Sequence, residues 1–219
     1  MSVAKLKVGM LGGTFDPVHF GHLRSAIEVR EALGLDRLHM IPAPQPPLRE
    51  SPQISAEQRF ELLKIGIGDT PGLLADGREL LRDGPSYSVD TLAELRREYG
   101  SDVPLIMIIG FDAFLRLAQW HRADTIFTLA HVVVIARPGY QTAWPDALRE
   151  LVGDREVDSN STLMQSPSGR LLTLTLPSMM AISATYIRER LSRGESVRYL
   201  LPEAVEKAIL QYGFYQTSE

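Results

Sequence analysis

The chain has 219 residues, enough to bury a substantial core as one domain or as one domain with an appended lobe. It carries 23 Lys and Arg against 27 Asp and Glu, and the net charge of -4 excludes a global basic field that would attract nucleic acid. The absence of cysteine excludes disulfides, thiolate nucleophiles and thiolate-bound zinc, and is typical of a reducing compartment. Any polyphosphate partner must therefore be held locally.

The N-terminal residues 1–7 are interrupted by Lys5 and Lys7 before any long apolar run forms. Signal peptides and membrane spans both need a longer apolar run than this. We therefore expect a cytoplasmic protein that does not associate with a membrane.

The first half of the chain predicts strands and helices in alternation. Residues 7–11 read as a buried strand, apolar residues at helical spacing follow from 23 to 33, and residues 38–42 read as a second strand. Ser55 and Gln58 form a capping-box pattern that opens a helix over about 56–67. A further helix is expected over about 89–99, with Asp90 placed in its first turn to favour the helix dipole.

The second half continues the alternation. Buried strands are expected over 105–109 and 132–135, a polar, irregular excursion over 152–170, and a last strand over 171–176. Ser183 is expected to cap a helix through Leu191, and Pro202 to begin a terminal helix that ends at Gly213. This order predicts an α/β fold with a mainly parallel sheet. We expect a single domain over 1–219, on which a helical part over about 183–219 packs.

The most informative stretch is 12–22, GGTFDPVHFGH, which joins the first predicted strand to the first predicted helix. Glycines let the backbone approach a phosphate, and a helix start offers unpaired N–H groups with a favourable dipole. His19 and His22 add donors that can carry charge near neutral pH. A turn built only for folding needs one glycine and a cap, so the stretch predicts a nucleotide site.

A transition-metal pair is the alternative interpretation of His19 and His22. The other histidines, His39, His121 and His131, show no spacing typical of metal ligands. We therefore expect no metal bound by protein ligands alone.

Polar and charged residues recur where predicted strands end. The carboxyl ends of strands in an open α/β sheet face one crevice, so we expect these residues to converge there. They are Thr14 to His22 after the first strand, Arg49 after the second, Asp112 and Trp120 after the third, Arg137 after the fourth, and Ser183, Thr185 and Arg188 after the last.

Five segments together resemble the bacterial nicotinate mononucleotide adenylyltransferases, over nearly the entire chain and in the same order. They are GGTFDPVHFGH (12–22), SYSVDTL (86–92), GFD (110–112), ARPG (136–139) and ISATYIR (182–188). The first and last indicate only the wider HxGH nucleotidyltransferase superfamily, whereas the middle ones indicate its pyridine-nucleotide branch. Two positions depart from the family: Leu48 where a histidine is frequent, and Ala184 where a serine is usual.

The resemblance implies a Rossmann-like, doubly wound sheet with helices on both faces. It implies transfer of AMP from ATP to nicotinate mononucleotide, which forms deamido-NAD and pyrophosphate in NAD biosynthesis. Magnesium is expected with ATP, held largely by phosphates and water. Whether the protein is a monomer or a homodimer is left open.

The resemblance also implies two sets of site residues. The ATP-binding set is Gly12, Gly13, Thr14, Phe15, His19, His22, Gly110, Ser183, Thr185 and Arg188, with His19, His22 and Arg188 as catalytic residues. The mononucleotide-binding set is Asp16, Arg49, Ser88, Asp112, Trp120, His121 and Arg137. Taken without the resemblance, Trp120 beside two leucines is also typical of a core residue, and Arg137 of a solvated turn residue.

Two other functions compete with this one. The first is an adenylyl- or cytidylyltransferase of the same superfamily that acts on another phosphorylated acceptor, such as phosphopantetheine. The second is a nucleotide-sensing module that binds ATP without turning it over. The Trp120, GFD and ARPG set argues against the first, and the charged donors aimed at a transition state argue against the second.

Overall fold

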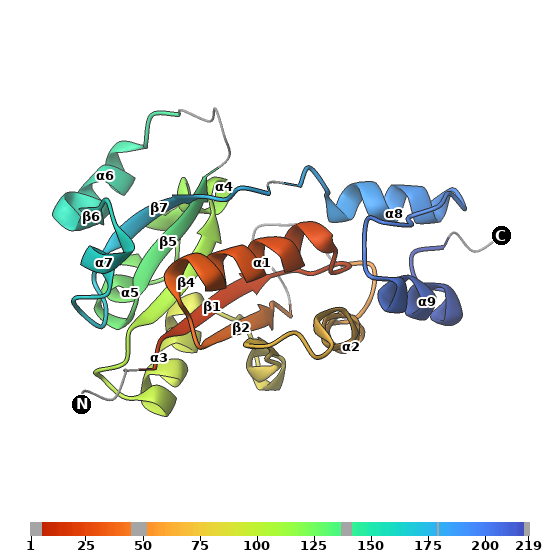
Figure 1. Ribbon diagram of the computed structural model, residues 1–219, viewed down its shortest axis with the longest axis horizontal. Helices are drawn as coiled ribbons and strands as arrows, with labels where there is room; N and C mark the ends of the chain where they lie inside the picture. Colours follow the sequence, from red (N-terminus) through yellow and green to blue (C-terminus); the bar gives the residue numbers. More distant parts are fainter. Residues whose placement is uncertain (1–5, 45–51, 137–141, 179, 217–219) are drawn as a thin grey trace. The chain divides into compact units, whose positions relative to one another are not determined.

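The computed structural model describes residues 6–44, 52–136, 142–178 and 180–216 (Figure 1). The chain divides into two compact units. The first comprises Met1–Gly12, Glu28–His39 and Tyr87–Pro177, and the second Gly13–Ile27, Met40–Ser86 and Ser178–Glu219.

Seven strands form one sheet in the order β3-β2-β1-β4-β5-β7-β6. The strands are β1 (Val8–Gly13), β2 (Arg37–Pro42), β3 (Leu73–Ala75), β4 (Leu105–Gly110), β5 (His131–Ala136), β6 (Glu156–Val157) and β7 (Leu171–Thr175). The helices are α1 (Phe20–Leu33), α2 (Ala56–Ile67), α3 (Ser88–Tyr99), α4 (Phe111–Phe114), α5 (Ala123–Leu129), α6 (Asp146–Val152), α7 (Asn160–Leu163), α8 (Ala184–Ser192) and α9 (Glu203–Tyr212).

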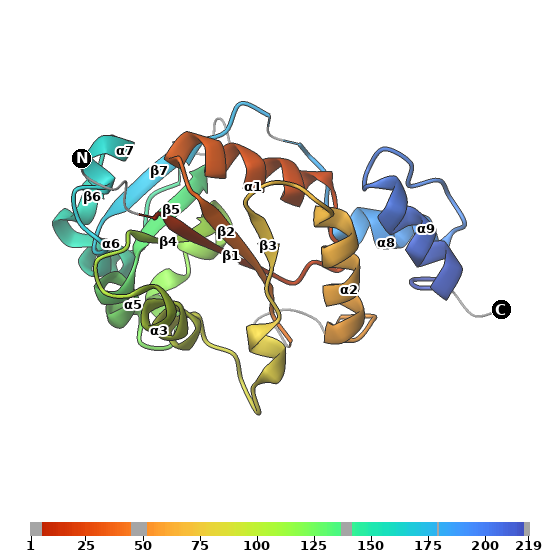
Figure 2. The same ribbon diagram turned by 60° about the horizontal axis from the view of Figure 1, so that its bottom comes forward.

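The first unit is built around parallel strands. β1 pairs with β4, β4 with β5, β5 with β7, and β7 with β6, all in parallel. Nine of the twelve residues of β4 and β5 are buried, as expected of strands covered on both faces. In Figure 2, the Glu28–Leu33 part of α1 lies on one face, and α3 and α5 lie side by side on the other. The predicted Rossmann-like, doubly wound fold is confirmed.

The parallel register brings two predicted ATP-binding glycines to one edge. Leu11 of β1 lies opposite Ile108 of β4. Gly12 and Gly110 follow these positions on their strands, so both lie at the carboxyl edge of the sheet, where ligands of α/β proteins bind.

The second unit is helical around the loop that follows β1. α2 begins with the predicted capping box, because the Ser55 hydroxyl accepts from the Gln58 N–H and the Gln58 side chain accepts from the Ser55 N–H. α2 also packs against α9 (Figures 1 and 2). A Cβ on Gly66 of α2 would lie 2.9 Å from Val18 and 3.3 Å from Val205. Glycine at this position therefore lets α2 approach both the loop and α9.

The expected elements are confirmed to within a few residues, including α8 after Ser183 and α9 between Pro202 and Gly213. The irregular excursion over 152–170 is a wrong expectation, because this segment contains β6 and α7. β6 has only two residues and forms because it pairs with β7. The local sequence does not predict this pairing. α4, α5, α6 and β3 were not expected either. The single-domain organisation stays a prediction.

Candidate active site

The loop between β1 and α1 belongs to the second unit and is shaped around Phe15. Phe15 is buried and has a φ of 48°, a left-handed backbone conformation that is uncommon outside glycine. Its ring meets the His22 ring edge-on, with the two centroids 5.1 Å apart. A Cβ on Gly13 would lie 2.9 Å from the Phe15 ring, so glycine is required there for Phe15 to occupy its place.

The two histidines of the loop form a stacked pair. The His19 and His22 rings lie 3.7 Å apart between centroids, at an interplanar angle of 23°. A Cβ on Gly21 would lie 3.0 Å from both Cε1 and Nδ1 of His19 and 3.4 Å from the carbonyl oxygen of Ile182. Gly21 thus provides room for the His19 ring and for the chain segment that leads into α8.

Burial sets the charge of His19. Its side chain is 4% exposed, and desolvation lowers its pKa from 6.5 to about 4. The imidazole is therefore neutral at pH 7, which differs from the charged donor expected from the sequence. Its buried Nδ1 has no hydrogen-bond partner among the residues the structure describes. An anionic phosphate beside this ring would raise its pKa and give it a partner.

The lowered pKa of His19 predicts a loss of stability on acidification. Between the folded value of about 4 and the unfolded value of 6.5, the unfolded chain binds more protons than the folded one. The neutral His19 makes its full contribution to the free energy of unfolding above pH 6.5. This contribution falls by about 3 kcal/mol in total as the pH drops from 6.5 to about 4. Burial also lowers the pKa of His131, which adds a loss of the same sign.

We therefore expect His19→Asn to lose less of its free energy of unfolding than the parent between neutral pH and about pH 5. Urea unfolding at both pH values measures this, and the His131 contribution remains in both proteins as an internal reference. Equal losses in the two proteins would contradict the burial of a neutral His19.

Arg188 of α8 reaches Asp16 in the loop, 172 residues earlier in the chain. Its Nη1 donates to the Asp16 carbonyl oxygen at 2.8 Å and lies 3.7 Å from Asp16 Oδ2. Its Nη2 lies 3.5 Å from Thr185 Oγ1. α8 begins as predicted, because the Ser183 hydroxyl accepts from the Tyr186 N–H at 3.2 Å. The two outer motifs of the sequence therefore meet within the second unit.

Sequence reasoning missed two residues that hold this loop. The Tyr215 hydroxyl donates to Asp16 Oδ1 at 2.8 Å. Arg59 is fully buried and donates to the carbonyl oxygens of Thr14 and Pro44 at 2.5 and 2.9 Å. Arg59 lies on the buried face of α2 with Leu62 and Leu63. Its position in the sequence could have revealed its role, because an arginine among core residues needs buried hydrogen-bond acceptors.

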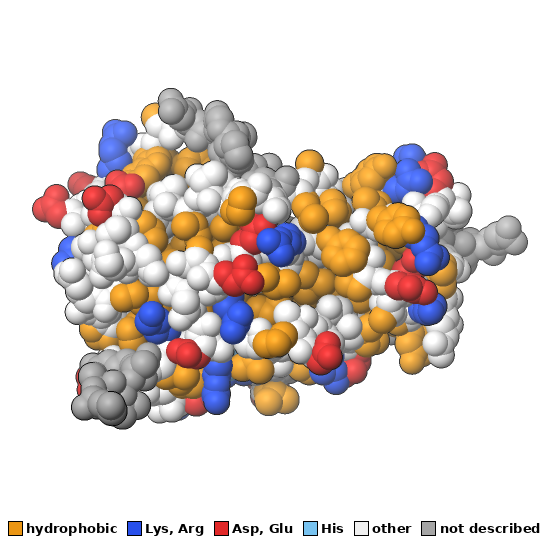
Figure 3. Space-filling view, viewed as in Figure 1, with side chains coloured by type: hydrophobic (Ala, Val, Ile, Leu, Met, Phe, Trp, Pro, Cys, Tyr) orange, Lys and Arg blue, Asp and Glu red, His pale blue; other side chains and the backbone are white. Residues whose placement is uncertain are grey.

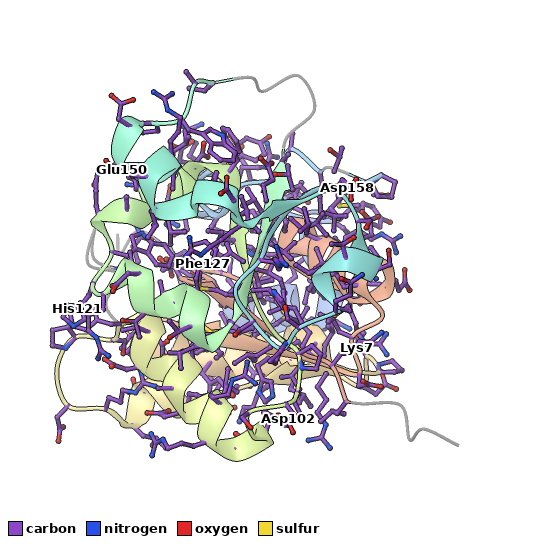
Figure 4. The ribbon with its side chains drawn as sticks, turned by 90° about the vertical axis from the view of Figure 1, so that its left-hand side faces the viewer. Lys7, Asp102, His121, Phe127, Glu150 and Asp158 are labelled. Atoms are coloured by element: carbon purple, nitrogen blue, oxygen red, sulfur yellow. The ribbon has the colours of Figure 1, made fainter. Side chains whose placement is uncertain are left out.

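Of the residues expected to bind the mononucleotide, Ser88 and His121 are neighbours of one ring contact in the first unit. The ring of Tyr87, directly before Ser88, stacks on His121 with centroids 4.3 Å apart. In Figure 4, His121 and Lys7 lie on opposite sides of this unit, and Asp102 lies at its lower end. Asp112 lies in α4 and is exposed.

Trp120 is half-buried rather than a core residue, whereas the neighbouring Leu117 is fully buried. Trp120 lines a surface depression together with Arg122 and Glu150. A ring that is partly exposed in a depression is free to stack on a ligand.

Several expectations about the site stay predictions. Arg49 and Arg137 lie outside the described residues. Asp16, expected to bind the mononucleotide, has its carboxylate held within the protein by Tyr215. Gly12 and Gly110 belong to the first unit and the other ATP-binding residues to the second. Convergence of the ATP-binding and mononucleotide-binding residues in one crevice likewise stays a prediction.

The described parts of the chain contain no group of three or more His, Asp or Glu side chains placed to hold a metal ion. None of the helices in these parts is long and apolar enough to cross a membrane. On the face viewed in Figure 3, Lys and Arg side chains are interspersed with Asp and Glu, without a broad basic patch among the described residues.

The geometry agrees with comparisons to known proteins. A family model described as cytidylyltransferase-like matches residues 10–190. A probable nicotinate-nucleotide adenylyltransferase from Chromohalobacter salexigens is 61% identical over 209 residues, which are 95% of each chain. One from Halorhodospira halophila is 50% identical over 208 residues, 95% of this chain and 94% of the relative.

Solved structures show the same fold. The Plasmodium falciparum nicotinic acid mononucleotide adenylyltransferase complexed with NaAD matches with a TM-score of 0.70 at 12% identity, over 96% of this chain and 97% of that one. Because its identity is low, this likeness bears on the fold alone, while the model match and the relatives bear on the family. The chain therefore belongs to the cytidylyltransferase-like family and, within it, to the nicotinate-nucleotide adenylyltransferases.

Proposed function

We propose that the protein transfers AMP from ATP to nicotinate mononucleotide, forming deamido-NAD and pyrophosphate in NAD biosynthesis. The observation that carries this proposal is the stacked pair of His19 and His22, held in a loop that is hydrogen-bonded to Arg188 through Asp16. The pair and the arginine are donors suited to a triphosphate, and they occur in a chain that belongs to this enzyme family.

The triphosphate contacts come from the second unit. We assign His22 to the α-phosphate, His19 to the triphosphate beside it, and Arg188 to the β- and γ-phosphates through the donors that Asp16 leaves available. Ser183 and Thr185, at the start of α8, add contacts at a helix N-terminus.

The backbone at Gly12 and Gly110 supports close approach of the nucleotide. A Cβ on Gly110 would meet nothing within 4 Å among the described residues, and one on Gly12 only the end of Met10 at 3.9 Å. Neither glycine has a positive φ. Because neither packing nor conformation requires glycine here, a ligand lying against the backbone is the explanation that we favour.

The reaction needs no general base. An oxygen of the mononucleotide 5′-phosphate, already anionic, attacks the α-phosphorus, and the bond from that phosphorus to the bridging oxygen of the β-phosphate breaks. Pyrophosphate leaves with that electron pair. Catalysis therefore rests on in-line placement and on donors aimed at charge that develops on the α-phosphoryl and leaving oxygens. His22 and Arg188 supply such donors.

A divalent cation is expected in an ATP-using nucleotidyltransferase, and we propose Mg²⁺. The described residues do not assemble three acidic or imidazole ligands. These residues are compatible with a cation that is held mainly by the triphosphate. When bound, this cation would neutralise part of the phosphate charge.

The mononucleotide contacts are proposed in the first unit. Trp120 stacks on the pyridine ring, backbone N–H groups at Ser88 and His121 meet its carboxylate, and Asp112 bonds the ribose. For the monophosphate we propose either Arg137 of the first unit or Arg49 of the second. We further propose a cytoplasmic location, in keeping with a chain that has no cysteine.

Purified protein given ATP, Mg²⁺ and nicotinate mononucleotide is expected to form deamido-NAD and pyrophosphate in equal amounts. A chelator should stop both products, because triphosphate charge would no longer be neutralised. Chromatography and a pyrophosphate assay measure the result. Product with phosphopantetheine and none with the pyridine mononucleotide would favour the rival transferase. ATP binding without pyrophosphate from any acceptor would favour a sensor.

A further inference from the structure

We propose that Tyr215 is a positioning residue for ATP binding: its hydroxyl holds the Asp16 carboxylate so that Arg188 stays available to the triphosphate. This inference rests on the proposed function and adds a residue from the C-terminal segment to it. Tyr215 lies two residues beyond Gly213, where α9 ends in a left-handed conformation.

The contact between Tyr215 and Asp16 is buried on both sides. Tyr215 is 7% exposed and Asp16 is 4% exposed, and the hydroxyl donates to Oδ1 at 2.8 Å across 199 positions of sequence. Tyr215 also has a φ of 63°, a strained conformation for a bulky residue. A backbone that adopts this conformation to bury a hydroxyl against a carboxylate indicates that the contact is specific.

Asp16 and a triphosphate compete for the same guanidinium. Arg188 Nη1 already donates to the Asp16 carbonyl oxygen, but it stands 3.7 Å from Oδ2, longer than a charge-assisted hydrogen bond of about 2.8 Å. The Tyr215 hydroxyl on Oδ1 and the Gln53 N–H, 3.4 Å from Oδ2, share the carboxylate charge. Without the hydroxyl, the carboxylate is free to turn and to close a direct ion pair with Arg188.

The charge of Asp16 is nevertheless needed where it is. The guanidinium of Arg59 is fully buried, its Nε has no partner among the described residues, and the Asp16 charge stabilises it. Asp16 therefore faces two arginines, and a neutral donor can hold it without adding a third cation. Burial and the Asp16 charge raise the pKa of Tyr215, so the phenol stays protonated as that donor.

The variant Tyr215→Phe tests the proposal, because it keeps the ring and removes only the hydroxyl. We expect KM for ATP to rise about tenfold, because the free energy of one hydrogen bond to a charged group corresponds to a change of about this size. We expect kcat and KM for nicotinate mononucleotide to change less than about twofold. The matched control is Tyr212→Phe, because Tyr212 is 63% exposed and its ring stacks on Phe214. The control should leave all three constants unchanged.

A purely structural role of Tyr215 predicts a different pattern of kinetic constants. Loss of folded protein lowers the apparent kcat in proportion to the inactive fraction and leaves KM for ATP unchanged. That result, with a lower Tm, would overturn the proposal. Calorimetric titration with ATP gives a second readout that needs no turnover, and an unchanged Kd in Tyr215→Phe would also overturn it.

The double variant shows whether the hydroxyl acts through Asp16. In an Asp16→Asn background, the added Tyr215→Phe change should alter the Kd for ATP less than about twofold, because the competing charge is already gone. A full tenfold further loss would show that Tyr215 acts elsewhere and would overturn the inference. Failure of the parent protein to form deamido-NAD would instead count against the proposed function, while the ATP titrations would still decide the role of Tyr215.

Discussion

Replacement of His22 with alanine is expected to lower kcat by about a hundredfold or more and to leave Tm nearly unchanged. A preorganised donor to a developing oxyanion is worth about 3 kcal/mol in the transition state. The His22 ring is half-buried and held between the stacked His19 ring and the edge of Phe15, so its orientation is set before substrate binds. Removal of a partly exposed ring costs little packing.

His39→Ala is the contrasting control for this experiment. His39 is buried, and its Nε2 lies 2.9 Å from the Tyr99 hydroxyl in the first unit, within a hydrogen-bonded pair that the mechanism does not use. We expect His39→Ala to have a lower Tm and an unchanged kcat per folded molecule. Single-turnover kinetics with thermal unfolding separate the two cases. Full activity with reduced stability in His22→Ala would make His22 a packing residue and remove it from the mechanism.

The protein is expected to prefer the acid form of the mononucleotide to the amide form by tens- to thousands-fold in kcat/KM. Each buried polar mismatch costs about 1 to 3 kcal/mol. The Tyr87–His121 stack places the start of α3 beside residue 121, and the first N–H groups of a helix have no acceptors within it. A carboxylate accepts from such groups with both oxygens, whereas an amide presents an NH₂ donor to them.

Trp120→Ala should then raise KM for both pyridine mononucleotides far more than KM for ATP. Trp144→Ala is the matched control, because Trp144 is the other tryptophan of the chain and packs edge-on against Phe114 at 4.9 Å between centroids. Steady-state kinetics with each mononucleotide measure both effects. The assignment of the pyridine pocket fails if the amide form is an equal or better acceptor, or if Trp120→Ala weakens ATP and mononucleotide alike.

Much of the secondary structure of this protein could be predicted from its sequence, because local interactions determine it. The Ser55–Gln58 capping box and the apolar stripe behind it predicted α2 at its observed bounds. Ser183 and Gly213 marked the start of α8 and the end of α9 in the same way. The glycines and histidines of 12–22 indicated a nucleotide loop because their chemistry is specific to that use. In each case the determining residues lie within a few positions of one another.

Tertiary structure decided what depends on distant residues. β6 exists through its pairing with β7, and the segment that contains it looked irregular because two residues make no pattern. The neutral state of His19 results from burial, which spacing does not reveal. The contacts of Asp16 with Arg188 and Tyr215 join positions 172 and 199 residues apart. A hydrogen bond between residues so far apart leaves no periodicity in the sequence, so only the folded chain shows which donor meets which acceptor.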